Sequence, residues 1–349
     1  MNFPELFQVI NEKEASDLHI KPNSVPVVRV HGKLMPLSTD PVNKDGLWSL
    51  FREMTSEEQQ AEFQTNKELD FSYQAEGGFR FRVNASLQKG QLCLALRKVS
   101  SQVPTLDELG LPPICKDLAT KKQGLVLVTG PTGSGKSTTL ASMISFLNQV
   151  ESRRIVTVED PIEYLHQDQK SFITQRELGS DTKSFAAAAK HALRQDPDVI
   201  LVGEMRDPET MAACLTAAET GHLVMSTLHT NNAPQSIDRI VDSFPPHQQN
   251  QIRMQLSLVL LATLSQRLIP RLDGNGRIAA VEVMVSNNAI QNLIREGKTH
   301  QMATIMQTGI EQGMQTMEWA LKRLYQDGMI SIDDARAHAL DKKSFQASL

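Results

Sequence analysis

The sequence predicts an α/β protein of two domains, in which a smaller N-terminal α+β domain precedes a larger domain with a parallel β-sheet. A chain of 349 residues is long enough for two domains of about 150 residues each. Up to about residue 99, apolar and polar residues alternate at the period of short β-strands. From about residue 125, short apolar runs alternate with helical patterns, which is typical of parallel strands joined by helices.

The composition is that of a folded, slightly acidic protein. Hydrophobic residues make up 40% of the chain, and 36 Lys and Arg against 40 Asp and Glu leave a net charge of −4. Proteins that coat nucleic acid are usually basic, so no nucleic-acid partner is expected. The three cysteines are far apart, which argues against a disulfide scaffold and fits the cytoplasm. The N-terminus is unlike a signal peptide and no apolar stretch approaches the roughly 20 residues of a membrane span, so we expect a soluble protein with at most peripheral membrane contact.

We expect the first domain to span residues 1–99. Its predicted elements are two strands joined by a turn at His31-Gly32, two helices and three more strands, at residues 27–30, 33–37, 44–52, 56–64, 69–73, 79–88 and 91–99. Turns at Gly77-Gly78 and Lys89-Gly90 separate the last three strands. The polar segment 100–105 contains a proline and is the expected linker to the second domain.

The last predicted hairpin of this domain places two arginines opposite each other. If Lys89-Gly90 is a two-residue turn, the numbers of opposed residues sum to 179, and the apolar residues of both strands then face one another. The same register pairs Arg82 with Arg97. Like charges in direct opposition are destabilising, and an anion would neutralise them. The alternative is two solvated side chains that splay apart.

The second domain is expected over residues 106–349, with a core at 106–270 and a C-terminal part at 271–349. Apolar runs indicate four buried strands of the core, at residues 125–129, 155–158, 199–202 and 223–228. The C-terminal part begins with a turn and one further strand, and continues as short helices interrupted by glycines.

The segment from Gly130 to Thr138 matches the pattern GxxxxGK[ST] and lies between a buried strand and an amphipathic stretch, as a phosphate-binding loop requires. Glycines let successive backbone N–H groups point at phosphate oxygens, and the following helix start adds positive potential. Lys136 is expected to reach the β- and γ-phosphates of ATP, and Ser137 to bind Mg²⁺. The residues expected to bind the nucleotide are Gly130, Thr132, Gly133, Ser134, Gly135, Lys136, Ser137 and Thr138.

Three carboxylates follow the strand at 155–158, at the sheet edge where ligands bind in open α/β proteins. We expect Glu159 and Asp160 to hold Mg²⁺ together with Ser137, and Glu163 to belong to the catalytic group. The alternative is a helix-capping Asp and a solvated Glu.

Glu204 follows the strand at 199–202, and Gly203 occupies the position where an Asp usually binds Mg²⁺. Glu204 is therefore expected to orient and deprotonate the attacking water. An ordinary surface glutamate after a strand is the alternative.

His222 and His229 flank the strand at 223–228 with a spacing that is not a helical metal-binding pattern. His229, at the carboxyl end, is expected to sense phosphate and to join the catalytic group. His222, at the other end, is a candidate for a subunit or domain contact. Either histidine could be purely structural.

Taken in order, these motifs resemble those of the type II/type IV secretion ATPase superfamily, and the resemblance covers nearly the whole chain. The segment EDPIE at 159–163 is similar to the Asp box of that family, GEMRD at 203–207 to its Walker B segment, and residues 220–230 to its His box.

Within the superfamily, the chain resembles the PilT-like pilus retraction ATPases. Residues 289–296 read AIQNLIRE, close to the AIRNLIRE pattern of that branch, although Gln291 stands where the pattern has Arg. The four-cysteine zinc element of the secretion and extension branches is missing from the sequence, which also favours retraction.

The resemblance implies a homohexamer whose protomers have a PAS-like N-terminal domain and a RecA-like ATPase domain, with ATP bound between them. In such motors, arginines of the N-terminal domain reach the γ-phosphate, which would give Arg82 and Arg97 a catalytic role. The motion would act at the inner face of the cytoplasmic membrane on a platform protein similar to PilC, and on pilin only indirectly.

Three other kinds of function stay open at this point: another ATPase of the same class, a ring scaffold and a nucleic-acid translocase. The chain could be an accessory retraction ATPase that works with a paralogous motor, or an ATPase of pilus assembly or type II secretion. It could be a ring scaffold that binds nucleotide without hydrolysis, although a scaffold needs no acid in the position of Glu204. A nucleic-acid translocase is the third, and the sequence shows no basic channel signal for it.

Overall fold

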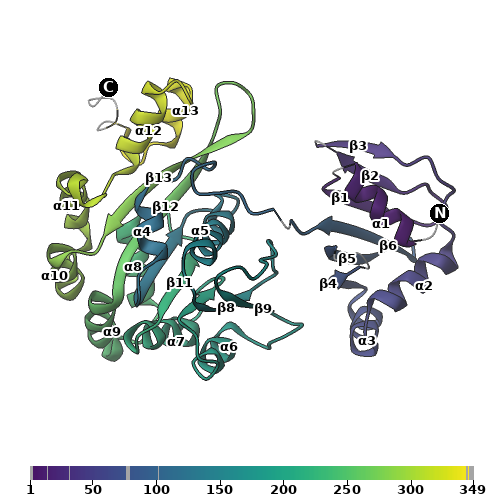
Figure 1. Cartoon of the computed structure of the whole chain (residues 1–349), viewed down its shortest axis with the longest axis horizontal. Helices are drawn as coiled ribbons and strands as arrows, with labels where there is room; N and C mark the ends of the chain where they lie inside the picture. The colour runs from purple at the N-terminus through teal and green to yellow at the C-terminus, as the bar shows by residue number, and fades with distance from the viewer. Residues whose placement is uncertain are drawn as a thin grey trace. The chain divides into compact units, whose positions relative to one another are not determined.

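The computed structural model describes residues 3–13, 15–30, 32–75, 79–100, 102–342 and 345. The chain divides into two compact units, Met1–Ser101 and Gln102–Leu349, whose elements are labelled in Figure 1. The predicted turn residues His31, Gly77 and Gly78 lie outside the described residues.

Within its described residues, the first unit is a six-stranded antiparallel sheet with three helices (Figure 1). The strands are ordered β3-β2-β1-β6-β5-β4. Their bounds are β1 Asp17–Ile20, β2 Val27–Val30, β3 Lys33–Pro36, β4 Glu68–Gln74, β5 Arg80–Gln88 and β6 Gln91–Lys98. The helices are α1 Phe3–Glu12, α2 Lys44–Met54 and α3 Glu57–Asn66.

Sequence patterns did not indicate α1 and β1. In α1, Leu6, Phe7 and Ile10 are buried in the core of the unit, and the Phe7 ring lies 5.1 Å from that of Phe81. Strand β1 has only four residues, too few to show a clear period, yet it pairs with both β2 and β6. Its place inside the sheet is therefore a tertiary effect.

The β5–β6 hairpin has the register that its apolar face predicts. Arg82 is paired with Arg97, and Leu87 with Leu92. The turn residues Lys89 and Gly90 have φ angles of 51° and 74°, as a tight two-residue turn requires. The prediction that the two arginines lie opposite each other on neighbouring strands is confirmed.

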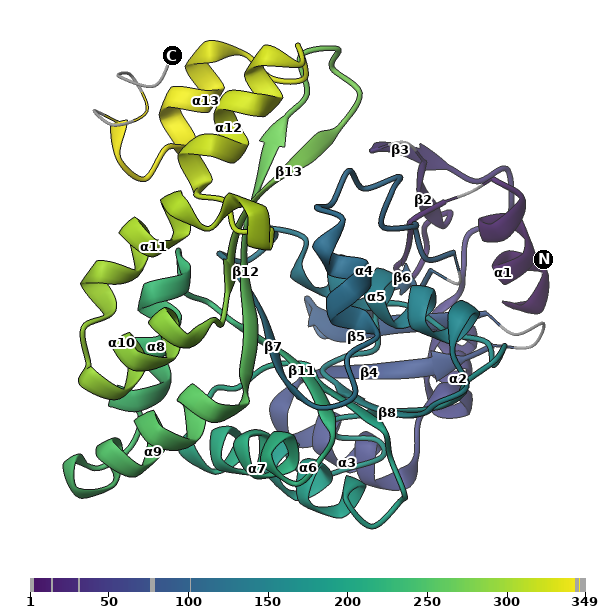
Figure 2. The ribbon, with the colours of Figure 1, turned by 60° about the vertical axis from the view of Figure 1, so that its left-hand side comes forward.

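Across residues 102–342, the second unit is built on a seven-stranded sheet in the order β13-β12-β7-β11-β10-β8-β9. Figure 2 labels β13, β12, β7, β11 and β8 of this sheet. The parallel strands are β7 Gly124–Thr129, β8 Arg154–Glu159, β9 Phe172–Glu177, β10 Val199–Val202, β11 Leu223–Leu228 and β12 Leu260–Pro270. Strand β13, Arg277–Val285, is antiparallel to β12. The four predicted apolar runs correspond to β7, β8, β10 and β11, and the α/β class is confirmed, whereas sequence patterns did not indicate β9 and β12.

Helices cover both faces of this sheet. Val126 and Val128 of β7 pack in one core with α4 (Ile114–Ala119) and α5 (Lys136–Val150). Leu125 and Leu127 pack in the other with α6 (Phe185–Ala192), α7 (Pro208–Glu219), α8 (Ala233–Asp242) and α9 (Pro246–Val259). Alternate residues of one strand thus enter opposite cores, which explains why its sequence is a continuous apolar run.

The C-terminal part contains α10 Asn288–Glu296, α11 Met302–Thr308, α12 Met317–Gln326 and α13 Ile332–His338. In α10, Ile290 and Ile294 are fully buried, whereas Gln291 and Arg295 are half-buried. The helices α12 and α13 form a small core of their own with β12 and β13. None of the helices within the described ranges has the length and apolar character to cross a membrane.

Candidate functional site

The loop between β7 and α5 has backbone angles that only glycine adopts easily. Gly130, Gly133 and Gly135 have φ angles of 141°, 77° and 89°. At Gly130, a Cβ atom would lie 2.4 Å from the carbonyl oxygen of Gln266. The hydroxyl of Ser134 is buried beside Gly130 and has no hydrogen-bond partner within the described residues. An anion in the loop would give this hydroxyl an acceptor, so the residues present fit a bound phosphate.

Lys136, the first residue of α5, folds back onto the loop. Its Nζ donates hydrogen bonds to the carbonyl oxygens of Gly130 (3.0 Å) and Pro131 (3.1 Å). Burial lowers the pKa of Lys136, and the negative charges of Glu204 and Glu163 oppose that shift. Phosphate oxygens could replace these two carbonyl oxygens as acceptors, and the hydrogen bonds of the buried ammonium would then be stronger because the new acceptors are charged.

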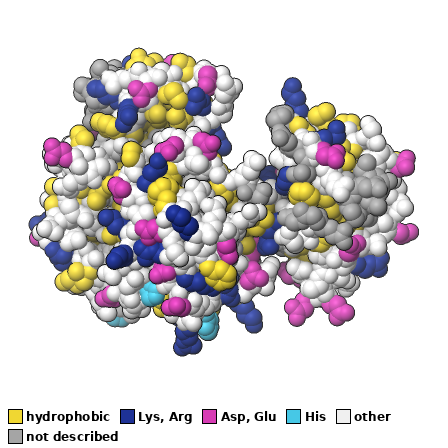
Figure 3. Space-filling model, in the orientation of Figure 1, with side chains coloured by type: hydrophobic (Ala, Val, Ile, Leu, Met, Phe, Trp, Pro, Cys, Tyr) yellow, Lys and Arg dark blue, Asp and Glu magenta, His cyan; other side chains and the backbone are white. Residues whose placement is uncertain are grey.

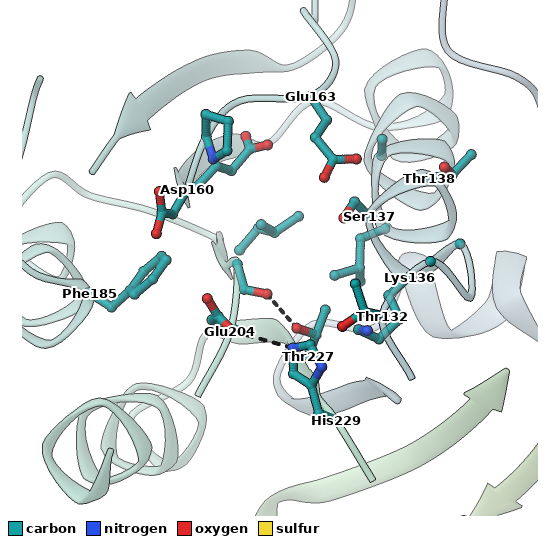
Figure 4. Close-up of a pocket in the computed structure, with 18 of the residues that line it drawn as sticks. Thr132, Lys136, Ser137, Thr138, Asp160, Glu163, Phe185, Glu204, Thr227 and His229 are labelled. Atoms are coloured by element: carbon teal, nitrogen blue, oxygen red, sulfur yellow. Dashed lines mark hydrogen bonds and ion pairs between the residues drawn. The ribbon is translucent and has the colours of Figure 1, made fainter. Parts of the chain in front are cut away.

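A cavity of about 440 Å³ opens beside this loop (Figure 4). It lies at the carboxyl ends of β8, β10 and β11, the edge where open α/β sheets bind ligands. The predicted site residues that line it are Thr132, Gly133, Gly135, Lys136, Ser137, Thr138, Glu159, Asp160, Glu163, Glu204 and His229. Gly130 and Ser134 form part of the loop but do not line the cavity.

Glu204 lies just beyond β10, next to two basic side chains. Its Oε2 is 2.6 Å from Nε of Arg206 and 3.5 Å from Nε2 of His229. The Glu204 side chain is only 11% exposed. Thr227 of β11 donates a hydrogen bond to the carbonyl oxygen of Gly203 (2.6 Å), which ties the backbone before Glu204 to the neighbouring strand (Figure 4). The structure therefore brings Glu204 and His229 together.

Arg206 is a cavity residue that sequence reasoning missed. Its side chain is 70% exposed. The only signal in the sequence was its position two residues after Glu204 in the segment GEMRD, and an arginine there is equally compatible with a solvated side chain.

Glu159 is held by hydrogen bonds within its own part of the sheet. Its Oε1 accepts from Oγ1 of Thr157 (2.6 Å) and Nε2 of Gln175 (3.1 Å). Burial raises the pKa of Glu159 above its usual value. One carboxylate oxygen of this predicted metal ligand is thus already engaged.

Asp160 and Glu163 face different parts of the cavity (Figure 4). Asp160 lies on the side of Phe185, whereas Glu163 is directed toward Ser137 at the start of α5. Of the three acids in this segment, Glu163 therefore has the orientation that best matches the phosphate loop.

Across the parts of the chain that the structure describes, no group of three or more His, Cys, Asp and Glu side chains could hold a metal ion. Mg²⁺ is normally bound by one or two protein oxygens together with phosphate oxygens and water. Ser137 and the nearby acids fit that mode, in which the nucleotide supplies part of the coordination sphere.

His222 lies at the opposite end of β11 from His229. Its Nδ1 is 2.9 Å from the carbonyl oxygen of Ala217 and 3.2 Å from the hydroxyl of Thr220. Both partners belong to the C-terminal end of α7. Its contacts within this unit are therefore local, and it does not line the cavity.

Arg82 and Arg97 belong to the first unit, where a protein carboxylate accompanies the pair. Nε of Arg97 is 2.9 Å from Oδ1 of Asp17, and Nε of Arg29 is 3.7 Å from Oδ2 of the same residue. Burial alone would raise the pKa of Asp17, but hydrogen bonds from Ser16 and Arg97 outweigh it and lower that pKa. Asp17 thus supplies a negative charge beside Arg97, whereas a ligand anion that binds both Arg82 and Arg97 stays a prediction.

Comparisons with known proteins all indicate the same family. The model of the type II/IV secretion system protein family matches residues 4–275. The type IV pilus ATPase PilU of Pseudomonas aeruginosa is 44% identical over 97% of this chain and 89% of its own length. The type IV pilus retraction ATPase PilT of the same organism is 44% identical over 99% of this chain and 100% of its own length.

A solved structure shows the same architecture. The crystal structure of the pilus retraction motor PilT with bound ADP is 45% identical in sequence, matches 99% of each chain and has a TM-score of 0.91. The match to the family model and the identity to these relatives each cover well over half of the chain. The chain therefore belongs to the type II/IV secretion system protein family.

Proposed function

We propose that this chain is a motor ATPase that drives the retraction of type IV pili. One observation carries the proposal: a single cavity contains the phosphate loop, Glu204 and Glu163, in a chain that is similar to a retraction ATPase over 99% of its length. A protein that only holds a nucleotide needs no buried acid beside the loop.

The side chains of the cavity divide the work of hydrolysis. Lys136 exchanges its two loop carbonyls for the β- and γ-phosphate oxygens of ATP. Glu204 accepts the proton of the attacking water, and Arg206 and His229 hold its carboxylate in place.

The residues that would hold Mg²⁺ are Ser137, Glu159 and Asp160, while Glu163 faces Ser137 across the cavity and belongs to the catalytic group. Bound there, the ion would neutralise charge on the phosphates. Glu159 and Asp160 would act on its water ligands. The nucleotide itself is held by the glycines of the loop together with Thr132, Ser134 and Thr138.

Arg82 and Arg97 act as the arginines that stabilise the charge on the γ-phosphate. Two observations support this role: they are paired across β5 and β6, and both side chains are exposed. Arg97 would leave Asp17 to do so.

The working form is a homohexamer at the cytoplasmic face of the inner membrane. It acts on a platform protein similar to PilC, and on pilin only indirectly. These points are supported by the resemblance to retraction motors. Measuring the mass of the purified protein in solution, with and without a non-hydrolysable ATP analogue, tests the hexamer.

The experiment that tests the function is a deletion of the gene, scored for surface motility and pilus number. If the chain drives retraction, the deletion strain should be immotile and carry an excess of pili. The wild-type gene should restore motility and normal pilus number, and the Lys136→Ala gene should not. Cells without pili would instead show that the chain is an assembly ATPase.

A second candidate is an accessory retraction ATPase that needs a partner motor. The identity to PilU equals the identity to PilT, and Gln291 departs from the retraction pattern on a half-buried position of α10. Expression in cells that lack every other retraction ATPase separates the two: an autonomous motor restores motility there, and an accessory one does so only beside its partner.

A further inference from the structure

The segment that carries Glu163 is fastened to the edge strand β9 by two side chains. The backbone N–H of Ile162 donates to Oε2 of Glu177 (3.0 Å), and the backbone N–H of His166 donates to Oε1 of Gln175 (2.8 Å). Nε2 of Gln175 in turn donates to the carbonyl oxygen of Tyr164 (2.9 Å). The backbone of Ile162, Tyr164 and His166, one residue before Glu163 and two after it, is thus hydrogen-bonded to side chains of β9.

The same amide reaches the acid at the end of the neighbouring strand. Nε2 of Gln175 also donates to Oε1 of Glu159 (3.1 Å), so one side chain bonds to the first acid of the segment and to the backbone beyond Glu163. Register explains this reach, because Gln175 is paired with Thr157 and Glu177 with Glu159 in the parallel β8–β9 ladder.

Gln175 and Glu177 are two positions apart on β9, so their side chains lie on the same face of the strand. Phe172 and Thr174 face the other way, where the guanidinium of Arg154 stacks on the Phe172 ring at 4.6 Å and donates to Oγ1 of Thr174 (2.9 Å). Because successive side chains of a strand alternate between faces, Gln175 and Glu177 share the face toward the acidic segment.

Loss of these hydrogen bonds would be costly because the groups that form them are buried. Glu177 is 3% exposed, and its own backbone N–H donates to the carboxylate of Asp181 (2.8 Å). Removing the acceptor of the Ile162 N–H would leave a buried donor unpaired, which costs more than an ordinary surface hydrogen bond. The segment therefore has a defined position that depends on β9.

The fastened segment is also joined to the phosphate-loop helix. The hydroxyls of Tyr164 and Thr138 lie 3.1 Å apart. Between the fastened residues, Glu163 projects into the cavity toward Ser137 (Figure 4). A shift of the segment would move this carboxylate relative to the phosphate loop, and misplacement by about 1 Å costs up to about 10²-fold in rate.

We propose that Gln175 and Glu177 are positioning residues that set the place of Glu163 in the cavity by fastening the backbone on both sides of it. The inference rests on the proposed function only for its kinetic consequence. The fastening itself is a property of the second unit and does not depend on pili or on a partner.

Turnover of ATP by the full-length protein tests the kinetic part. Gln175→Leu and Glu177→Ala should each lower kcat about tenfold and change the Kd for ADP less than twofold. Glu177→Gln keeps an oxygen acceptor for the Ile162 N–H and should retain most of the turnover. Thr174→Val, which removes a bond on the opposite face of the same strand, is the matched control and should leave both values unchanged.

A double-mutant cycle distinguishes positioning from a general loss of stability. If Gln175 acts through Glu163, Gln175→Leu should lower turnover less than twofold in a Glu163→Gln protein, because the two changes are then not additive. A further tenfold loss in that background would overturn the proposal, as would wild-type kcat in the Gln175→Leu and Glu177→Ala single variants.

Hydrogen exchange separates this inference from the proposed function. The Ile162 amide should exchange at least tenfold faster in Glu177→Ala than in wild type, and the His166 amide likewise in Gln175→Leu, with Thr174→Val unchanged. Hydrogen exchange can be measured without catalysis. If the wild-type protein did not turn over ATP, the proposed function would be refuted and the fastening would not. Unchanged exchange in both variants would refute the fastening, including for a protein that turns over ATP normally.

Discussion

Two arginine–carboxylate pairs, one in each unit, have similar contact distances and exposures, but the candidate function belongs to the arginine in one pair and to the carboxylate in the other. Arg97 Nε lies 2.9 Å from Asp17 Oδ1, and Arg206 Nε lies 2.6 Å from Glu204 Oε2. In both pairs the carboxylate is 11% exposed, and the arginines are 72% and 70% exposed. The candidate catalytic group is the exposed arginine in the first pair and the buried carboxylate in the second.

The difference shows what each role demands of its environment. A base must be held in one place, and Glu204 lies against Arg206 and His229 at the buried end of a strand. An arginine that binds a phosphate must move to it. An ion pair with an exposed partner is worth only about 1 kcal/mol or less, so Arg97 can exchange Asp17 for a better acceptor. A pair of this kind thus holds the buried carboxylate of Glu204 in place, and it leaves the exposed guanidinium of Arg97 able to move to a phosphate.

The largest expected effect concerns the arginines of the first unit. Arg82→Ala and Arg97→Ala should each lower ATP turnover by about 10³-fold or more, the usual scale for an arginine that stabilises phosphoryl transfer. Lysine should restore little, because it lacks the bidentate geometry of a guanidinium. Steady-state phosphate release measures both. Unchanged turnover in the two alanine variants would remove the first unit from the chemistry.

Melting temperature distinguishes the two arginines from each other. Arg97→Ala should lower the melting temperature, because the mostly buried carboxylate of Asp17 then keeps the hydrogen bond from Ser16 but has its nearest cation, Arg29, at 3.7 Å. Arg82→Ala should not lower it, since Arg82 has no ion pair within the described part of the chain and stands opposite another arginine.

Glu204 should show the next largest effect. Glu204→Gln should cut turnover by about 10²-fold or more and leave nucleotide binding intact, because a lost general base affects the chemical step alone. Lys136→Ala should weaken binding as well. Binding of a fluorescent ATP analogue and phosphate release provide the two readouts. Near-normal turnover of Glu204→Gln would transfer the role of base to another acid, with Glu163 the next to test.

Arg206 should matter much less than the acid it contacts. Arg206→Ala should lower turnover by about two- to tenfold, because His229 remains near Glu204 and the arginine itself is mostly solvated. The comparison is made under saturating ATP with Glu204→Gln measured beside it. A loss as large as that of Glu204→Gln would mean that Arg206 is as important for turnover as the acid that it contacts.

The smallest expected effect is that of Asp17 on stability. Hydrogen bonds hold the folded-state pKa of Asp17 below its ordinary value of 3.8, so its charge stabilises the fold above about that pH, and this stabilisation is lost as the pH falls through the folded-state pKa. Asp17→Asn should therefore melt a few degrees below wild type at pH 7, and the gap should shrink below about pH 4. A gap that is constant with pH would show that the ionised form contributes nothing.

Features encoded by neighbouring residues were predictable from the sequence. The phosphate loop is a contiguous motif, and its glycines stand where the backbone has positive φ. The pairing of Arg82 with Arg97 follows from a two-residue turn and an alternating apolar face, and the observed register agrees. Glu204 was found because a buried strand of four apolar residues ends just before it.

Elements whose sequences lack a clear period were missed. Strand β9 lies at the sheet edge and is mostly polar, and β12 carries Ser265, Gln266 and Arg267 in its interior although it pairs with β7 and β13. A strand that pairs with neighbours on both sides usually has a continuous apolar sequence. The polar residues of β12 interrupt that pattern, so the sequence did not indicate the strand.

The sequence by itself determined the class of fold, the phosphate loop and the acids at the strand ends, because these depend on the local period of apolar residues and on glycines at fixed spacing. Only the tertiary structure decided which charges meet. Asp17 and Arg97 are 80 positions apart and become neighbours because β1 pairs with β6. Gln175 reaches the acidic segment because β9 lies in register beside β8. Hydrogen bonds of this kind depend on distances of about 3 Å between side chains and backbone of different strands, and no spacing along the chain encodes them.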